Sequence, residues 1–490
     1  MRHLSSSGGT VGQPVWPVSH PDLDVLDIAG VTADSRQVVP GDVFAALPGT
    51  RSDGRAFIGE AVARGAVAIL APPDTVWPVG VPRRPLITDA EPRRCLARMA
   101  AVLAGPQPRT VVAVTGTNGK TSTVEFLRQF WGLAGHKSAS LGTLGLIAAG
   151  FDPGPGLTTP DPVSLAETLA GLARAGVARV AMEASSHGLD QFRLDGVTLA
   201  GAAFTNLTRD HLDYHGTIEA YRLAKLRLFD ALLPPGAPAV VHATIDPDTL
   251  TALRAIAKTH RLALTTVGEG GERFRLLATT PRPDGQVLDL ELDGTHRSVF
   301  LPLPGRFQAD NVLGAAALAE AFGDPDPISR FDGLVGVRGR MELAARLPNG
   351  AAVYVDYAHT PDALDRLLTA LRPHTIGRLA VVFGAGGDRD RGKRPLMGTA
   401  ASRLADIAII TDDNPRSEDP ATIRAAIRAA CPDAMEIGDR ARAIEAGLSL
   451  LGPGDVLVVA GKGHEQGQTI GTDVIPFDDA SIVRSLAGVP

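Results

Sequence analysis

One stretch decides the fold of this 490-residue chain: Val111-Val112-Ala113-Val114-Thr115-Gly116-Thr117-Asn118-Gly119-Lys120-Thr121-Ser122. Its first four residues are apolar and predict a short buried strand. Apolar residues at 124, 127, 130 and 131 predict that a helix follows. A strand, a glycine loop and a helix start form a phosphate cradle, because backbone N–H groups and the helix dipole point at the anion. The stretch therefore predicts an α/β domain that binds a nucleotide.

The loop residues have separate roles in such a cradle. Gly116 and Gly119 permit close approach of the backbone, Lys120 would reach the terminal phosphates, and the Thr121 hydroxyl would contact magnesium. Val114 stands where G-x-x-x-x-G-K-T has its first glycine, so the general motif is incomplete. An ordinary glycine-rich turn between strand and helix is the alternative.

Composition narrows the class of protein. The chain is 44% hydrophobic and 21% charged with a net charge of −6, which argues against nucleic acid as the main partner. Its two cysteines, Cys95 and Cys431, form no metal-binding spacing and fit a reducing compartment. No apolar run approaches the roughly 18 residues of a membrane span. We expect a cytoplasmic, monomeric protein without membrane insertion, of about three domains.

The first predicted unit covers residues 1–107, of which 1–20 form a loose leader. Strand-like residues at 43–47, and a helix end, glycine and strand over 61–71, predict a small α/β domain. Its loop at Ser35 and Arg36 would bind an anion, or Arg36 is only a turn residue. A proline-containing linker over 105–108 leads to the nucleotide loop.

The second unit covers residues 108–338. A polar loop over 157–162 precedes a predicted helix over 164–173, and a predicted strand over 178–183 ends in Glu183. An acid at the carboxyl end of a buried strand beside a phosphate loop is suited to hold magnesium, although Glu183 facing water is the alternative. A third strand, 201–206, leads to Asp210, His211 and Asp213, which would serve a metal or give only loop polarity.

A helix predicted over 217–232 carries Tyr221, Lys225, Leu228 and Phe229 on one apolar stripe. Lys225 would extend to the surface, or it would be a desolvated amine with a lowered pKa; the residues alone favour the first. Residues 265–300 predict a β-ribbon, and the glycines at 268–271 form no dinucleotide loop because no helix follows them. A further helix is expected to begin at Asn311.

The third unit covers residues 339–490. Apolar strands are predicted at 379–383, 407–410 and 456–459, and each leads into a charged or glycine-rich loop. Helices predicted at 361–371 and 420–430 lie between strands and indicate a parallel sheet. In such sheets ligands bind beyond the carboxyl ends of the strands, so the loops are expected to converge on arginines for anions and acids for an amine. The basic run 389–394 would otherwise be a solvated face.

Taken together, these motifs resemble the Mur ligases of peptidoglycan synthesis. The matching segments occur in family order along nearly the whole chain, and the shortened nucleotide loop is the form that the family uses. They are the segments at 115–121, 183–191, 206–216, 339–342, 355–364, 386–390, 413–416 and 461–465.

The resemblance implies a UDP-binding N-terminal domain, a central ATPase with a mainly parallel sheet, and a Rossmann-like C-terminal domain for the incoming amino acid. It implies an ATP-dependent, magnesium-requiring ligase that joins a peptide carboxylate to an amine through an acyl phosphate. The implied substrates are ATP, UDP-N-acetylmuramoyl-L-alanyl-D-glutamate and meso-2,6-diaminopimelate.

The resemblance also assigns residues to roles. Lys120, Glu183, His211 and a carbamylated Lys225 would be catalytic, with Thr121, Glu183, His211 and the Lys225 carbamate supporting magnesium; this replaces the surface interpretation of Lys225. ATP would contact Gly116, Thr117, Asn118, Gly119, Lys120, Thr121, Ser122, Asn311, Arg340 and Asp356. The muramoyl peptide nucleotide would contact Ser35, Thr158, Thr159, Ser185, Gln191 and Arg193. Diaminopimelate would contact Arg389, Asp413, Asn414, Arg416, Gly461 and Glu465.

The choice of amino acid has a physical basis. Diaminopimelate carries a second carboxylate at its far end, which Arg389 and Arg416 would bind, while Asn414 and Glu465 would take the ammonium group. Lysine has no such carboxylate and would leave arginine unpaired, a difference of about 10⁴-fold. The alternatives are the same reaction with L-lysine, a sister ligase such as folylpolyglutamate synthetase, and a P-loop regulator that hydrolyses nucleotide without forming a bond.

Overall fold

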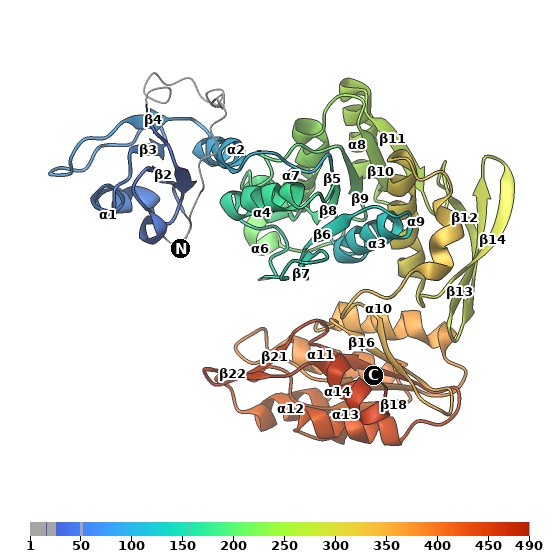
Figure 1. Cartoon of the computed structure of the whole chain (residues 1–490). Helices are drawn as coiled ribbons and strands as arrows, with labels where there is room; N and C mark the ends of the chain where they lie inside the picture. The colour runs from blue at the N-terminus through green and yellow to red at the C-terminus, as the bar shows by residue number, and fades with distance from the viewer. Residues whose placement is uncertain (1–15, 17–25, 50–51, 155, 490) are drawn as a thin grey trace.

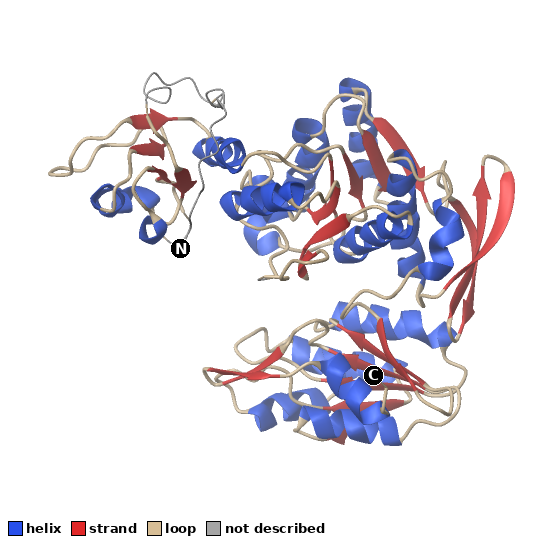
Figure 2. Ribbon diagram, viewed as in Figure 1, coloured by secondary structure: helices blue, strands red, loops and turns tan. Residues whose placement is uncertain are grey.

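The computed structural model describes residues 16, 26–49, 52–154 and 156–489, so most of the predicted leader lies outside the described residues. Three large sheets occupy successive stretches of the chain (Figures 1 and 2). The N-terminal and C-terminal units both adjoin the central unit and face each other across open space (Figure 1). This arrangement matches the expected three-domain α/β architecture.

The N-terminal unit is a parallel four-stranded sheet in the order β1-β2-β3-β4. Its strands are Gly30–Thr32, Asp42–Ala45, Ala68–Ala71 and Leu86–Thr88, with helices α1 (Ile58–Ala63) and α2 (Pro92–Ala104). The predicted strand over 43–47 and the helix–glycine–strand unit over 61–71 are both present. Helix α2 packs against the central unit through Val163 and Ala166 of α4 (Pro162–Arg174).

The central sheet has seven strands in the order β11-β10-β9-β5-β8-β6-β7, and only the edge strand β7 is antiparallel. The predicted strands are β5 (Thr110–Thr115), β8 (Arg179–Glu183) and β9 (Gly201–Phe204), and β6 (Ser138–Gly142), β7 (Gly145–Ile147), β10 (Pro238–His242) and β11 (Ala263–Val267) complete it. Strand β5 lies at the centre, where the chain first winds outward to β6 and later returns to β9. The nucleotide loop is therefore at a switch point of the sheet, where ligands bind in this class of fold.

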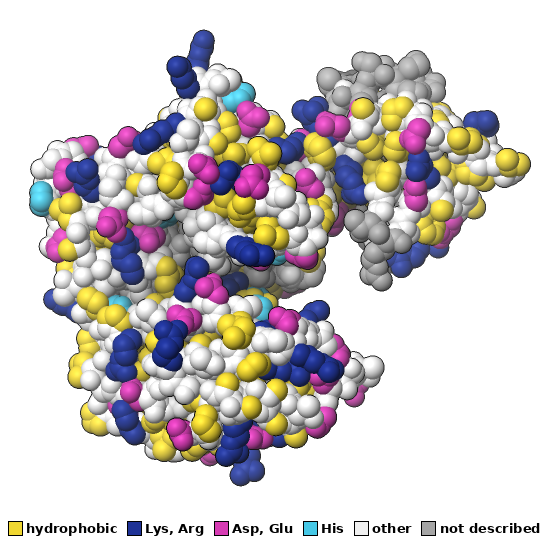
Figure 3. Space-filling view, turned by 180° about the vertical axis from the view of Figure 1, so that it is seen from behind, with side chains coloured by type: hydrophobic (Ala, Val, Ile, Leu, Met, Phe, Trp, Pro, Cys, Tyr) yellow, Lys and Arg dark blue, Asp and Glu magenta, His cyan; other side chains and the backbone are white. Residues whose placement is uncertain are grey.

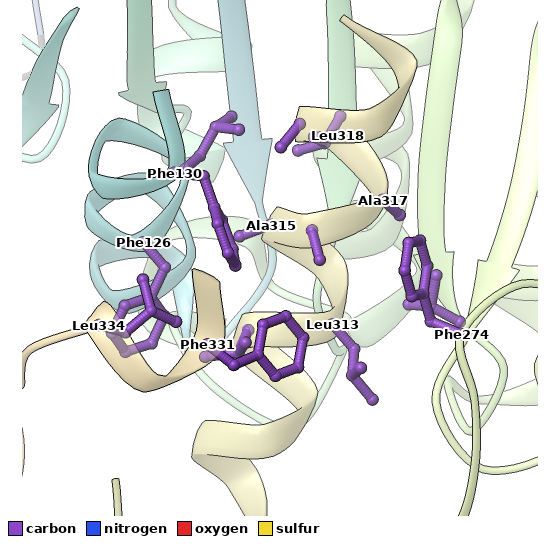
Figure 4. Close-up of a cluster of buried hydrophobic side chains, with 14 of the residues drawn as sticks. Phe126, Phe130, Phe274, Leu313, Ala315, Ala317, Leu318, Phe331 and Leu334 are labelled. Atoms are coloured by element: carbon purple, nitrogen blue, oxygen red, sulfur yellow. The ribbon is translucent and has the colours of Figure 1, made fainter. Parts of the chain in front are cut away.

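Alternating residues of β5 face two separate cores. Val112 and Val114 pack with α3 (Lys120–Leu133) and α9 (Arg306–Ala321), whose aromatic and aliphatic side chains interlock with Phe331 and Leu334 (Figure 4). The opposite face, with Val111, packs with α4 and α8 (Pro247–His260). Burial on both faces explains the uninterrupted apolar run of β5.

Three sequence expectations in this unit need correction. Asn311 does not open a helix: α9 begins at Arg306, directly after Gly305, whose φ of 89° ends the extended segment. The helix expected over 217–232 is α7 (Ile218–Arg227) followed by a π-helical turn (Leu228–Leu232). Residues 265–267 belong to β11, and the ribbon is the antiparallel sheet of β12 (Arg275–Arg282), β13 (Gly285–Leu292) and β14 (Thr295–Leu301). The glycines at 268–271 lead into β12, not into a helix, as expected.

The C-terminal sheet has the order β15-β16-β20-β17-β18-β19 and is parallel except for β15. The strands are Glu342–Arg346, Ala352–Asp356, Val456–Ala460, Leu379–Phe383, Ile407–Ile410 and Met435–Glu436. Helices α10 (Pro361–Leu371), α11 (Lys393–Leu404) and α12 (Pro420–Arg428) cover one face, and α13 (Arg440–Ser449) and α14 (Asp479–Ala487) cover the other. The predicted parallel sheet is confirmed, and a hairpin of β21 (Gly467–Ile470) and β22 (Asp473–Pro476) lies beside its ligand edge.

The central and C-terminal units meet at a buried histidine. The backbone N–H of Gly305 donates to Nε2 of His374 at 2.9 Å, and Nδ1 of His374 lies 2.9 Å from the carbonyl of Arg282.

In Figure 3 acidic and basic side chains are interspersed over the visible face of the described residues. Within the described residues, no helix is long and apolar enough to cross a membrane.

Candidate active site

The nucleotide loop leaves the end of β5 and enters α3 at Lys120. Gly119 precedes the helix in a left-handed conformation, with φ of 83°, and no side chain caps the first turn of this 14-residue helix. A Cβ at Gly119 would lie 2.3 Å from Oδ1 of Asn311, and a Cβ at Gly116, where φ is 142°, would lie 1.9 Å from Oγ1 of Thr205. Both glycines are therefore required, and uncapped N–H groups remain available to an anion.

Neighbouring strand ends hold the loop in place. Oγ1 of Thr205, just beyond β9, donates to the carbonyl of Asn118 at 2.6 Å. The N–H of Asn118 donates to the side chain of Asn206 at 2.9 Å, and the hydroxyl of Thr117 donates to the carbonyl of Thr208 at 3.2 Å. The loop is therefore a rigid cradle positioned by the adjacent strand.

Two lysine amines converge on one loop carbonyl. Nζ of Lys120 lies 3.0 Å from the carbonyl oxygen of Gly116 and 2.8 Å from that of Thr117, and Nζ of Lys225 lies 2.8 Å from that of Gly116. Burial lowers the pKa of Lys120, while Glu183 opposes that shift. Lys225 is 1% exposed, and its pKa is well below the ordinary value because of burial and, secondarily, the charge of Lys120. Lys225 thus lies inside the site and does not extend to the surface.

Lys225 is surrounded by aromatic and imidazole groups. Its Nζ lies 4.4 Å from the centroid of the Tyr221 ring, and the Tyr221 hydroxyl contacts Oγ1 of Thr117 at 3.3 Å. His211, in a left-handed conformation, stacks edge-on at 5.0 Å from His187 and 6.1 Å from Tyr221. Burial lowers the pKa of His187. The structure therefore places Lys225 and His211 around the same tyrosine beside the loop.

Glu183 is buried at the end of β8. Its Oε1 accepts the N–H of Thr143 at 2.7 Å, and its Oε2 accepts the hydroxyl of Thr143 at 3.2 Å. Thr143 also contacts the hydroxyl of Thr158 at 3.1 Å, while the hydroxyl of Thr159 donates to the carbonyl of Glu183 at 3.1 Å. The carboxylate and the predicted threonine pair thus form one hydrogen-bonded unit.

The residues present fit a magnesium ion shared with nucleotide phosphates. Within the described part of the chain, no three His, Cys, Asp or Glu side chains cluster as a complete metal site. Magnesium is commonly held by one or two carboxylates, with water and substrate phosphates supplying the other ligands. Glu183, the Thr121 hydroxyl and His211 are compatible with such a site, and a carbamate on Lys225 would add a second carboxylate-like group.

Four of the residues expected to contact the muramoyl peptide are joined by hydrogen bonds. Arg193 donates to the carbonyl of Thr159 at 2.7 Å and to Oε1 of Gln191 at 2.8 Å. Oγ1 of Thr159 accepts the N–H of Ser185 at 3.0 Å. Ser35 is placed elsewhere: its hydroxyl donates to Glu60 at 2.7 Å inside the N-terminal unit. Among the described residues, no hydrogen bond joins Ser35 to the others.

Arg340 of the C-terminal unit lies near the nucleotide loop, and Asp356 lies near Arg340. The Arg340 guanidinium lies 4.8 Å over the Tyr357 ring, and its Nε is buried without a hydrogen-bond partner among the described residues. Its charge also acts on Lys120, whose pKa it lowers in addition to the larger effect of burial. Asp356 accepts the N–H groups of Met341 and Ala358 at 2.7 and 2.8 Å, and burial raises its pKa. A half-buried guanidinium whose Nε has no partner among the described residues fits a phosphate that bridges the two units.

The predicted loops converge at the carboxyl ends of β17, β18 and β20. A guanidinium N–H of Arg416 donates to the carbonyl of Gly387 at 2.8 Å. Arg416 itself has φ of 52°, and its N–H and carbonyl bond to Thr469 and Gly471 of the hairpin. The Arg389 side chain is exposed, and no described residue accepts a hydrogen bond from it. The two arginines thus lie in adjoining loops with donors available for an anion.

The acids of this site are Asp413, which is buried, and Glu465, which is partly exposed. Asp413 is 6% exposed, forms no salt bridge within the described residues, and faces Gly461, where a Cβ would lie 2.6 Å from its Oδ2. Glu465 accepts a hydrogen bond from Nδ2 of Asn414 at 2.9 Å. Oδ1 of Asn414 already accepts the N–H of Thr469 at 2.9 Å, so the carboxylates are the acceptors left for a ligand ammonium.

Several contributing residues were missed at the sequence level. Thr143 acts through Glu183, 40 residues away. Tyr221 was placed on the apolar helical stripe without a role in the site, because its contact with Thr117 spans 104 residues and no local pattern reveals it. Lys462 and Arg440 are buried beneath the amino-acid loops. Lys462 lies inside the segment 461–465 that matches the family, but the match assigned it no role.

The nucleotide loop lies at a switch point of the central sheet, and charged loops lie at the carboxyl ends of the C-terminal strands. These features define a three-domain enzyme that uses a nucleoside triphosphate. Family models described as Mur ligase family, catalytic domain, Mur ligase middle domain, and Mur ligase, glutamate ligase domain match residues 27–102, 114–319 and 339–463. The chain belongs to the Mur ligase family, whose members are ATP-dependent ligases that form amide bonds.

Individual relatives support this assignment. UDP-N-acetylmuramoyl-L-alanyl-D-glutamate–2,6-diaminopimelate ligase of Caulobacter vibrioides is 55% identical over 473 residues, covering 94% of this chain and 96% of the relative. A solved structure of a ligase with the same description is 34% identical, with a TM-score of 0.71 and coverage of 94% and 95%. Folylpolyglutamate synthase of Mycobacterium tuberculosis complexed with ADP and AMPPCP, at 21% identity, TM-score 0.62 and coverage of 81% and 95%, shares the fold alone.

Proposed function

We propose that this protein adds meso-2,6-diaminopimelate to UDP-N-acetylmuramoyl-L-alanyl-D-glutamate, with hydrolysis of ATP to ADP and phosphate. The observation that carries the proposal is that two arginines, the buried Asp413 and the partly exposed Glu465 lie together at one sheet edge. Arg389 and Arg416 suit the far carboxylate of diaminopimelate, and Asp413 and Glu465 suit its ammonium group. The relatives named above, described as diaminopimelate ligases, support this choice over lysine and over folylpolyglutamate synthesis.

Each unit would bind one substrate: residues 1–107 would bind the uridine nucleotide, 108–338 would bind ATP and 339–490 would bind the amino acid. Ser35 would lie on the uridine side, and the hydrogen-bonded set around Thr159 and Arg193 would orient the peptide. Asn311, next to Gly119, would contact the adenine side, and Asp356 would contact the ribose. The cytoplasmic location and monomeric state remain predictions.

In the first step, a peptide carboxylate oxygen attacks the γ-phosphorus of ATP and ADP leaves. Lys120 and Arg340 stabilise the charge on the transferring phosphoryl group from the two sides of the domain interface. Thr121, Glu183, His211 and the carbamate of Lys225 would hold magnesium, which neutralises phosphate charge when bound. The buried amine of Lys225 favours carbamylation, because only the uncharged amine reacts with CO2.

In the second step, the free amine of diaminopimelate attacks the acyl phosphate carbon, phosphate leaves with its oxygen, and the amine proton is released. Asp413, Glu465, Arg389 and Arg416 hold the far end of the amino acid, so the reacting amine is presented in one orientation. The acyl phosphate lies in the central unit and the amino acid in the C-terminal unit. Closure of these units must therefore bring the two together.

Amino-acid selectivity tests the proposal. Wild-type enzyme should incorporate diaminopimelate about 10⁴-fold more efficiently than L-lysine, measured as kcat/KM with the UDP-dipeptide and ATP saturating. Arg416→Met should lose most of that preference, because the far carboxylate then has one fewer charged donor. Arg442→Met removes an exposed arginine on α13 and should leave the preference unchanged. A wild-type preference for lysine would contradict the proposal.

A further inference from the structure

A buried cation lies directly behind the amino-acid loops. The side chain of Lys462 is 0% exposed, and its Nζ donates to Oδ1 of Asn414 at 3.0 Å and to Oε2 of Glu465 at 3.1 Å. None of the steps described above uses this amine. Keeping a lysine fully out of water is costly unless its charge and donors are matched, so its position needs a physical explanation.

The backbone around Lys462 forms a tight turn between two glycines with positive φ. Gly461 and Gly463 have φ of 120° and 55°, and the N–H of Glu465 donates to the carbonyl of Lys462 at 3.0 Å, which closes a turn. A Cβ at Gly463 would lie 2.7 Å from Cβ of Tyr357. The turn therefore fixes Lys462 and Glu465 on the same side of the loop, within reach of each other.

The hydrogen bonds leave one oxygen of Glu465 available. Oε2 accepts from both Lys462 and Nδ2 of Asn414, whereas Oε1 accepts from no described residue. The carboxylate is 34% exposed, so Oε1 is accessible to a ligand. Asn414 is fully engaged, since its Oδ1 accepts from Lys462 and from the N–H of Thr469. Glu465 rather than Asn414 is then the direct acceptor of a ligand ammonium.

The charges of Lys462, Asp413 and Glu465 also indicate that the site accepts one ammonium group. Lys462 contributes one positive charge, and Asp413 and Glu465 contribute one negative charge each, which leaves a net charge of −1. The nearby Arg440 does not alter this balance, because it forms a fully buried ion pair with Asp479. One remaining negative charge matches one ammonium group. Without Lys462, Glu465 would have no ion-pair partner among the described residues.

We propose that Lys462 is a positioning residue that determines the affinity for the amino acid by fixing Glu465 and Asn414. It does not touch the substrate: its charge and two hydrogen bonds orient the acceptor oxygen. This inference rests on the proposed function, because it concerns the same amino-acid site.

Lys462→Met tests the inference, since methionine has similar length without charge. The KM for diaminopimelate should rise about 10- to 100-fold, which corresponds to losing one charge-assisted hydrogen-bonding partner. The KM values for ATP and the UDP-dipeptide should stay within about threefold. Arg442→Met, an exposed charge removal in the same unit, should change none of the three. A general loss of structure would instead lower the thermal midpoint and affect all substrates alike.

A double-mutant cycle identifies the residue through which Lys462 acts. In the Glu465→Gln background the acceptor carboxylate is already lost, so adding Lys462→Met should change the KM for diaminopimelate less than twofold. The double variant leaves no unpaired Lys462–Glu465 charge, so it gives an answer even if Lys462→Met alone does not fold. Additive effects, or an unchanged KM in the single variant, would overturn the inference. A wild-type enzyme that ignores diaminopimelate would instead refute the proposed function.

Discussion

Replacing Lys225 with methionine should separate stability from activity, because this amine is buried without an acidic partner. Nζ donates to the carbonyl of Gly116 at 2.8 Å and lies over the Tyr221 ring, and within the described residues it forms no salt bridge. Its pKa is well below the ordinary lysine value because of burial. Methionine fills similar space, and no counter-charge is left unpaired by the change.

The size of each effect follows from these contacts. The carbonyl of Gly116 still accepts Nζ of Lys120 at 3.0 Å, so Lys225→Met removes one hydrogen bond without leaving an unsatisfied acceptor. The expected loss of stability is about 0.5–1.5 kcal/mol. Activity should fall about 10²- to 10³-fold in kcat, as when one preorganised group that stabilises an oxyanion in the transition state is removed from an enzyme.

Two measurements check this prediction: the thermal midpoint and the rate of phosphate release at saturating substrates. Lys225→Ala should lose activity similarly and regain part of it with added bicarbonate, which can occupy the space of the missing carbamate. Lys258→Met, which removes an exposed lysine of α8, is the control and should behave as wild type. Full activity in Lys225→Met, or a destabilisation of about 3–5 kcal/mol typical of a broken buried ion pair, would refute the reasoning.

Three further predictions concern other parts of the site. Burial lowers the pKa of His464 from 6.5 to about 4, so the unfolded chain binds the proton first as pH falls. As the pH falls from about 6.5 to 4, the free energy of unfolding is then lowered by up to roughly 3 kcal/mol. The thermal midpoint of His464→Asn should fall less steeply with pH than that of the wild type. An equally steep fall in the variant would contradict this prediction. Gly119→Ala should weaken ADP binding about tenfold, measured by calorimetry. The added Cβ would lie 2.3 Å from Oδ1 of Asn311, and the backbone at this position has a positive φ. An unchanged affinity for ADP would exclude the steric argument. Arg440→Met should lower the free energy of unfolding by about 3–5 kcal/mol, because it leaves Asp479 buried and unpaired. Adding Asp479→Leu should recover most of this stability in denaturation experiments. No recovery would rule out the ion-pair explanation.

The sequence predicted the elements well where one physical signal dominated. The apolar run before Gly116 predicted β5, and the loops after three apolar strands predicted the ligand edge of a parallel sheet. Each of these rests on a local pattern and on the rule that parallel strands present their carboxyl ends together. The start of α9 was predicted wrongly at Asn311, because a capping-type residue was taken as the helix start, whereas Gly305 ends the preceding segment.

Long-range contacts explain what the sequence could not predict. Lys225 lies on an apolar helical stripe, a position from which lysines usually reach the surface. The family resemblance, not the local pattern, placed Lys225 in the site, and its hydrogen bond to Gly116, 109 positions away in the chain, shows that it lies beside the nucleotide loop. Asn414 was expected to take the ligand ammonium, but its amide is already engaged by Lys462 and Thr469. Amide orientation depends on neighbours from other loops, so no local pattern contains it.

The central claim is that ATP cleavage here serves amide-bond formation. Its most direct test measures phosphate release from ATP with each combination of the UDP-dipeptide and diaminopimelate, together with the mass of the product. The account predicts release only when both substrates are present, in a one-to-one ratio with a tripeptide nucleotide. Phosphate release that needs neither substrate, or that proceeds without a new amide bond, would contradict it.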